Sequence, residues 1–148
     1  MPEKETLERA EQDKREGKSP STQAGEFVRE EIHHIREGKH GAASAKQAVA
    51  IGLSKARRAG VELPPPKKGR VSEKTRKAAE RDTKRGRSSK KKVSAKRSRS
   101  SETALKRKPR SAASHKALSR QAKSAARARK KSGAATQSRR TQSRRKAA

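Results

Sequence analysis

The chain has 148 residues, of which 44 are Lys or Arg and 15 are Asp or Glu, so its formal net charge is +29. Hydrophobic residues make up 26%, against roughly 45–50% in an ordinary soluble domain, and Phe27 is the only aromatic residue. This composition excludes a large buried core, and the absence of Cys excludes disulfides and thiolate metal ligands. No apolar run is long enough for a membrane span, and no hydrophobic signal segment opens the chain, so we expect a cytoplasmic or nucleoid location.

Residues 1–18 are predicted to form a charged N-terminal helix. Glu5 and Arg9, and then Glu11 and Arg15, have the i,i+4 spacing that stabilises an exposed helix by about 0.2–0.5 kcal/mol per pair. Few apolar side chains interrupt this pattern, so the helix should be solvated and should end at Gly17.

Residues 19–63 are predicted to form a helical hairpin. The first helix begins after Ser19 and ends at Gly38, and its apolar side chains recur at helical spacing: Ala24, Phe27, Val28, Ile32 and Ile35. The second begins at a capping box of Ser44 and Gln47 and is followed by Gly60; its stripe comprises Ala45, Ala48, Val49, Gly52, Leu53 and Ala56. The simplest packing is an antiparallel pair with Phe27 at its centre.

The remaining chain is predicted to be polar. Residues 64–86 comprise a stiff spacer, Pro64–Pro66, and a polar helix from Ser72 to Lys84 that Gly86 closes. Residues 87–148 contain 23 basic residues and one acidic residue, so they repel one another and are expected to form a disordered polycationic tail. The Ala-rich stretch 112–131 could become helical when phosphates screen its charge. The expected fold class is therefore mostly α: a small helical hairpin module with flanking polar helices and a long disordered basic tail.

One block resembles a known family. The segments STQAGEF, GKHG, QAVAIGLSKARRAG and PPPKKG follow one another between Ser19 and Gly69. In this order they resemble small basic bacterial proteins that share an uncharacterised conserved helical domain. The resemblance implies a bacterial origin and a common helical module, and it implies no activity. The tail resembles, in composition, the Lys/Ala/Ser/Pro tails of linker-histone-like bacterial proteins.

The strongest functional signal is the cationic tail. Spaced Lys and Arg neutralise backbone phosphates and release counterions, which gives affinity without sequence reading. We therefore predict non-sequence-specific binding of double-stranded DNA, with a role in nucleoid compaction or protection. The predicted contact residues lie in the hairpin and spacer and in the tail: Lys55, Arg57, Arg58, Lys67, Lys68 and Arg70, and then Lys90, Lys91, Lys92, Lys96, Arg97, Arg99, Lys106, Arg107, Lys108, Arg110, Arg127, Arg129, Lys130, Lys131, Arg139, Arg140, Arg144 and Arg145.

Other functions stay open at this point. Structured RNA, including ribosomal RNA, offers the same phosphate density as DNA. The acidic N-terminal region suggests a charge-driven adaptor that binds the tail or a basic partner, and the hairpin could self-associate or bind another protein. Ala48 and Gly52 have the spacing of the Ala and Gly residues in a helix-turn-helix motif, but residues 44–58 indicate one continuous helix. An interfacial membrane helix is disfavoured because the basic stretches lack an apolar face.

Catalysis and metal binding are not predicted. His33, His34 and His40 are expected to be surface residues, and Glu30 and Glu31 to form solvated ion pairs, because neither set shows the spacing of a tight site. No phosphate-binding loop, nucleophile elbow or HExxH motif occurs in the sequence. We expect no cofactor.

Overall fold

The protein is built from helices. The computed structural model describes residues 2–88 and 94–146, with side chains described as far as Lys131. The elements are α1 Lys4–Arg15, α2 Pro20–Glu37, α3 Ala45–Arg58, α4 Glu73–Arg87, α5 Ala95–Lys106, the 3-10 turn η1 Arg110–Ala113 and α6 His115–Lys146. The described residues contain no β-strand, so the mostly α fold class is confirmed; Lys68 and Val71 form an isolated bridge. Within these residues, no helix is both long and apolar enough to cross a bilayer.

Local capping sequences set the ends of α2 and α3. Ser19 caps α2 by accepting a hydrogen bond from the backbone N–H of Thr22, and Gly38 ends the helix in the left-handed region at φ 81°. Ser44 caps α3 through the N–H of Gln47, as the capping box predicts. The amide oxygen of Gln47 accepts from the N–H of Ala43, one residue before the position that the motif predicts.

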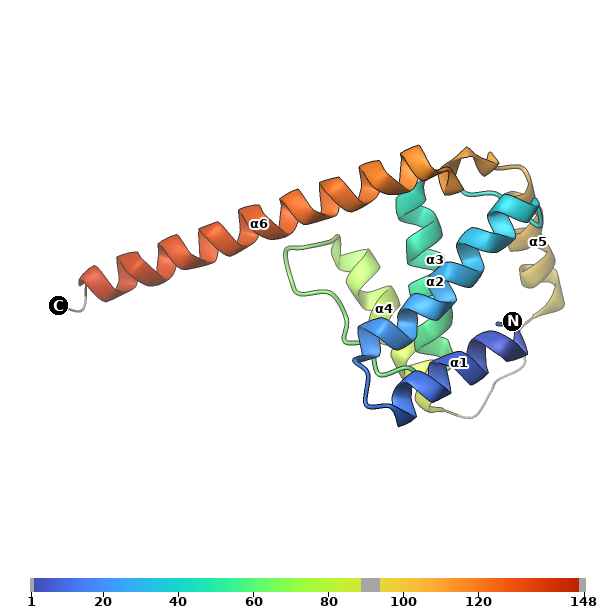
Figure 1. Ribbon diagram of the computed structural model, residues 1–148, viewed down its shortest axis with the longest axis horizontal. Helices are drawn as coiled ribbons and strands as arrows, with labels where there is room; N and C mark the ends of the chain where they lie inside the picture. The colour runs from blue at the N-terminus through green and yellow to red at the C-terminus, as the bar shows by residue number, and fades with distance from the viewer. Residues whose placement is uncertain (1, 89–93, 147–148) are drawn as a thin grey trace.

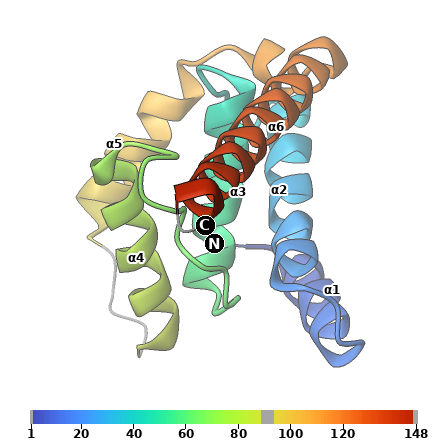
Figure 2. The same cartoon turned by 90° about the vertical axis from the view of Figure 1, so that its left-hand side faces the viewer.

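The α2–α3 hairpin is the centre of the fold. The two helices run side by side in opposite directions (Figures 1 and 2), and their mutual contact is the most extensive in the molecule. Phe27 is 1% exposed and packs with Ala24, Ala56 and Val61, while α1 contributes Ala10 to the same cluster. The predicted hairpin with a central Phe27 is therefore what the structure has.

α4 covers α3 on another side. Ser72 caps α4 as predicted, and Ala79 is its buried residue. The helix does not close at Gly86, as we expected, but continues through it to Arg87. Because α4 packs along α3, contact with α3 favours helix beyond the residue at which local propensity alone predicts an end.

The described part of the segment after residue 87 contacts the hairpin mainly through η1, and α6 adds contacts with α3. No residue of α5 is buried, and no described side chain of α6 is buried, so these two helices have no hydrophobic core of their own. Between these helices, Ala112 and Ala113 of η1 are buried against Ile35, Ala42 and Ala48. From η1, α6 extends beyond the rest of the molecule (Figure 1).

Backbone hydrogen bonds hold this attachment, which we call the anchor segment, residues 105–113. The N–H of Gly41 donates to the carbonyl of Leu105 at 3.0 Å, and the N–H of Ala42 donates to that of Pro109 at 3.2 Å. Arg36 Nε donates to the carbonyl of Ala113 at 3.0 Å. The start of α6 is thus fixed relative to α2, which the sequence did not predict.

Candidate nucleic-acid interface

The first predicted contact residue, Lys55, is not available to phosphate. Its side chain is 17% exposed, and its Nζ lies 2.7 Å from Oε2 of Glu31 and 3.2 Å from Oε1 of Glu30. Glu30 and Glu31 are themselves 4% and 0% exposed. The expectation of solvated ion pairs at these carboxylates is therefore wrong, because both acids lie on the face of α2 that packs on α3. Lys55 serves as their counter-charge inside the hairpin.

Arg57 is also buried, although it was predicted to contact phosphate. It is 7% exposed and its Nη2 donates to the carbonyl of Pro64 at 3.4 Å. Burial lowers the pKa of the Arg57 guanidinium, and the charge of Asp82 partly opposes that shift. Its neighbour Arg58 stays exposed, with Nε 3.2 Å from the carbonyl of Ser54 and 3.9 Å from Oδ1 of Asp82. Of these two arginines, therefore, only Arg58 can contact a ligand in solvent.

The loop between α3 and α4 keeps its predicted cations at the surface. Lys67, Lys68 and Arg70 are exposed, and the backbone turns there through a hydrogen bond from the N–H of Arg70 to the carbonyl of Lys67. These side chains remain candidates for phosphate contact.

The predicted tail cations fall into three groups: two that contact a named side chain, a set that is exposed, and a set whose side chains are not described. The first group is Lys106, which is exposed and pairs with Glu102 at 2.8 Å, and Lys108, which is half-buried with its Nζ 3.4 Å from the amide oxygen of Gln47. The exposed group comprises Lys96, Arg97, Arg99, Arg107, Arg110, Arg127, Arg129, Lys130 and Lys131. Lys90, Lys91 and Lys92 lie outside the described residues, and so do the side chains of Arg139, Arg140, Arg144 and Arg145, whose backbone belongs to α6.

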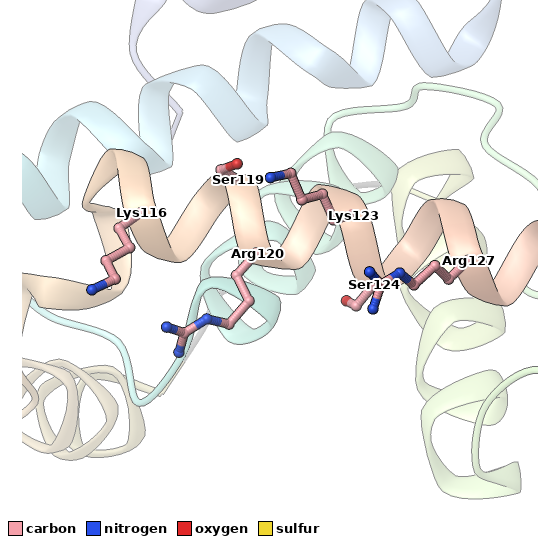
Figure 3. Close-up of a pocket in the computed structure, with 6 residues that line it drawn as sticks. All are labelled: Lys116, Ser119, Arg120, Lys123, Ser124 and Arg127. Atoms are coloured by element: carbon pink, nitrogen blue, oxygen red, sulfur yellow. The ribbon is translucent and has the colours of Figure 1, made fainter.

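Four exposed cations lie on one face of α6. Lys116, Arg120, Lys123 and Arg127, which we call the α6 cation row, line a shallow groove of about 420 Å³ together with Ser119 and Ser124. Their spacing of four, three and four residues keeps them within a narrow arc, because each residue turns an α-helix by about 100°. In the close-up of Figure 3, Lys116 and Arg120 extend away from α2. The row is a linear array of positive charge with hydroxyl groups beside it.

The other face of α6 is turned toward the protein. Leu118, Gln121 and Ala125 are half-buried, and their positions on the helix are about opposite those of the cation row. Among the described residues, none of the four cations of the row has an ion-pair partner, and no acidic residue follows Glu102 in the sequence. The charge of the row is therefore uncompensated and faces solvent.

The sequence prediction missed most of this row. It selected clusters of adjacent cations, which include Arg127 but omit Lys116, Arg120 and Lys123. The available signal was the 4-3-4 spacing, which is hard to notice because the residues between the cations are Ala, Leu, Ser and Gln. The prediction considered a helix over residues 112–131 only with phosphate bound, and it did not use the helical spacing of the cations there.

Comparison with known proteins bears on the hairpin and not on the tail. Residues 13–68 match a family of unknown function, DUF6496. This match fits the uncharacterised conserved domain that the sequence motifs indicated, and it includes α2 and α3 but none of α4, α5 or α6. No curated protein and no solved structure matches the chain.

Proposed function

We propose that this protein binds double-stranded DNA without sequence specificity, and that the α6 cation row is its principal contact surface. The observation that supports this proposal most directly is the row of four exposed cations on one helix face, without an acidic partner in the described part of the chain. Lys67, Lys68 and Arg70 in the α3–α4 loop and the other exposed tail cations add further contacts. In a bacterial cell, such binding corresponds to association with the nucleoid.

The length of the row suits a duplex. Lys116 and Arg127 are eleven residues apart, which is about 16 Å along the helix axis. A DNA duplex presents one negative charge per roughly 1.7 Å of its axis, so several phosphates lie within reach of the four side chains. If each cation neutralises one phosphate, the row contributes about −3.6 to the slope of log K against log salt concentration.

The position of Phe27 favours a duplex over a single strand. Binding of single-stranded nucleic acid uses aromatic side chains on which bases stack. Phe27 is the only Phe, Tyr or Trp of the chain and is 1% exposed in the hairpin core. Contacts with a duplex backbone require only cations. Structured RNA presents similar phosphates and is therefore included in the test.

The N-terminal helix does not favour the adaptor alternative. Glu3 pairs with His34 and Lys39, and Glu26 of α2 pairs with Arg9 of α1. These contacts direct α1 to α2 rather than to the cation row. We therefore propose that the row is open to an external polyanion.

The test is a salt-dependent titration of the full chain with duplex DNA and structured RNA of equal length. A row variant changes four residues to Gln: Lys116, Arg120, Lys123 and Arg127. A control variant removes the same charge from exposed positions of α1 and α2: Lys4, Lys14, Arg15 and Arg29. We expect the row variant to lose about 3.6 from the magnitude of the salt slope, and the control to lose much less.

Two outcomes would contradict the proposal. If both variants lose the same affinity and slope, net charge and not the α6 row determines binding. If structured RNA binds clearly more tightly than DNA, the substrate class is wrong. Truncation after Ser114 provides a second check, since it removes α6 and keeps the anchor segment that covers Ile35.

A further inference from the structure

A second site lies inside the hairpin, away from α6. Glu30, Glu31 and His34 lie on α2, His40 lies in the following loop, and we call these four residues the Glu–His cluster. Potential ligand atoms of Glu31, His34 and His40 all lie within 4.8 Å of one another. His34 is 8% exposed and the His40 side chain 15%, so the expectation of surface histidines is wrong for both. His33, which is 67% exposed by its side chain, does lie at the surface.

The carboxylate of Glu31 is buried without a hydrogen-bond partner. The residue is 0% exposed, and neither Oε1 nor Oε2 accepts a hydrogen bond from any described group. Lys55 Nζ is 2.7 Å from Oε2, but this contact lacks the direction of a hydrogen bond and is an electrostatic one. A buried carboxylate with unfilled acceptor positions is costly unless a cation satisfies it.

Both histidines turn a ring nitrogen toward these carboxylates. Nδ1 of His40 faces the carbonyl of Gly41 at 3.3 Å, and a carbonyl only accepts, so this nitrogen is the donor. The other ring nitrogen, Nε2, lies 3.4 Å from Oε1 of Glu31. In the same way, Nε2 of His34 donates to Oε1 of Glu3 at 2.8 Å, and its Nδ1 lies 3.9 Å from Oε1 of Glu30. A cation between these nitrogen and oxygen atoms would satisfy both.

One distance within the cluster has the value that zinc requires. Zn²⁺ binds His nitrogen and carboxylate oxygen at about 2.0–2.2 Å, and tetrahedral ligands at that range are about 3.3–3.6 Å apart. The 3.4 Å between His40 Nε2 and Glu31 Oε1 already has this value. Glu3 is placed as the outer carboxylate that orients a metal-bound His.

The charge of the cluster agrees as well. The side chains of Glu30 and Glu31 are 2% and 0% exposed, and the one ammonium group that contacts both belongs to Lys55. Lys55 therefore supplies one positive charge for two buried carboxylates. A divalent cation would balance both carboxylates and release Lys55, whose side chain is long and still partly exposed.

We propose that Glu31, His34 and His40 bind a Zn²⁺ ion, and that the Lys55 ammonium competes with the ion for the same carboxylates. This site is independent of the DNA-binding proposal, because it uses none of the cations of α6. Its role would be to join α2 to the loop that follows it.

The test is calorimetric titration of the metal-free full chain with zinc chloride. We expect one equivalent to bind to the wild type and to His33→Ala, the control that removes an exposed histidine from the same helix. His40→Ala in the loop and Glu31→Gln in the helix should bind at least 10-fold more weakly, and Glu3→Gln should lose about 10- to 100-fold through the orienting contact. Lys55→Gln should bind more tightly than the wild type, because it removes the competing cation.

Circular dichroism of each variant establishes that it is folded, and the thermal midpoint gives a second readout. Zinc should raise the midpoint of the wild type and should raise that of Lys55→Gln by more. The proposal is overturned if His33→Ala weakens binding as much as His40→Ala does, or if zinc leaves the midpoint of the wild type unchanged. A tighter site in Lys55→Gln together with loss in His40→Ala would support it.

Discussion

α2 and α3 approach each other closely at Gly52, and a substitution there tests the packing of the hairpin. A Cβ added at Gly52 would lie 2.6 Å from Cα of Val28, 2.9 Å from its Cγ2 and 3.0 Å from the carbonyl oxygen of Phe27. Two of these three atoms belong to the backbone of α2, so no rotamer change relieves the contact. Gly52→Ala therefore has to push the two helices apart.

The magnitude follows from two opposing effects. Alanine is favoured over glycine in a helix interior by about 0.8–1 kcal/mol, and overpacking a tight contact costs about 1–3 kcal/mol. Gly25 provides the matched control, because it lies in α2, is exposed and has nothing within 4 Å of an added Cβ. Gly25→Ala should stabilise the protein by roughly 0.5–1 kcal/mol. The propensity gain is common to both variants, so the difference between them measures the overpacking cost alone.

Thermal unfolding followed by circular dichroism at 222 nm measures this difference. For a folded unit of 60–100 residues, 1 kcal/mol shifts the midpoint by about 4–8 °C, so Gly52→Ala should melt several degrees below Gly25→Ala. Equal midpoints for the two variants would refute the close approach of α2 and α3 at this position. A Gly52→Ala variant more stable than the wild type would refute it more strongly.

Two further predictions concern ion pairs. Lys55→Ala removes the ammonium group that two buried carboxylates share, so it should lower the free energy of unfolding by about 3–5 kcal/mol. Chemical denaturation without added metal measures this change. The control Lys46→Ala, at an exposed position, should change the free energy of unfolding by less than about 0.5 kcal/mol. Lys106 hydrogen-bonds to the carboxylate of Glu102 and lowers the pKa of that group. The stabilisation of α5 by this pair should therefore be fully present above the pKa of Glu in an unfolded chain, about 4.3, and should be lost as the pH falls through the lower pKa of the folded state. A pH titration of the Glu102 carboxyl carbon by NMR checks the direction, and a pKa at or above the value of a denatured chain would contradict it.

The helices themselves were largely predictable because their signals are local. Ser19 and Ser44 cap through side-chain oxygens, and Gly38 ends α2 at a positive φ that only glycine adopts readily. The position of Phe27 in the core also follows from periodicity, since a helix-spaced apolar stripe requires a partner. None of these inferences requires knowledge of which other segment packs on the helix.

The Glu–His cluster could not be predicted by the same reasoning. Glu31 is four residues after Phe27 and four before Ile35, so it lies in the middle of the stripe that the apolar residues define. Reasoning from composition assigns a charged residue to solvent, as is usual for exposed helix pairs. Glu31 can be buried because Lys55 lies opposite it on the packing face of α3. This pairing depends on the register between the two helices, which the sequence does not reveal.

The anchor segment was missed for a different reason. Ala112 and Ala113 are too small to form a recognisable apolar stripe, and they follow a run of cations in the sequence. Their burial depends on packing against Ile35 of α2, Ala42 of the loop and Ala48 of α3. The sequence contains no local signal for such a contact.

The anchor segment connects the fold to the proposed function and leads to a last prediction. A Cβ at Gly41 would lie 1.9 Å from the carbonyl oxygen of Lys108, so Gly41→Ala should break the backbone contacts with the anchor segment and release α6. The variant keeps every cation of the α6 cation row, so its salt slope on duplex DNA should stay that of the wild type. Its affinity should fall, because a released segment has to be ordered again on binding.

Hydrogen exchange tests the structural half of this prediction through the amides of Gly41 and Ala42, which should lose protection while amides within α3 keep theirs. A titration at several salt concentrations tests the other half. If the amides of Gly41 and Ala42 lose protection but the affinity for DNA is unchanged, the fixed start of α6 does not contribute to binding. A reduced slope would mean that cations of the anchor segment, such as Arg107 and Arg110, need the attachment to α2 in order to contact phosphate.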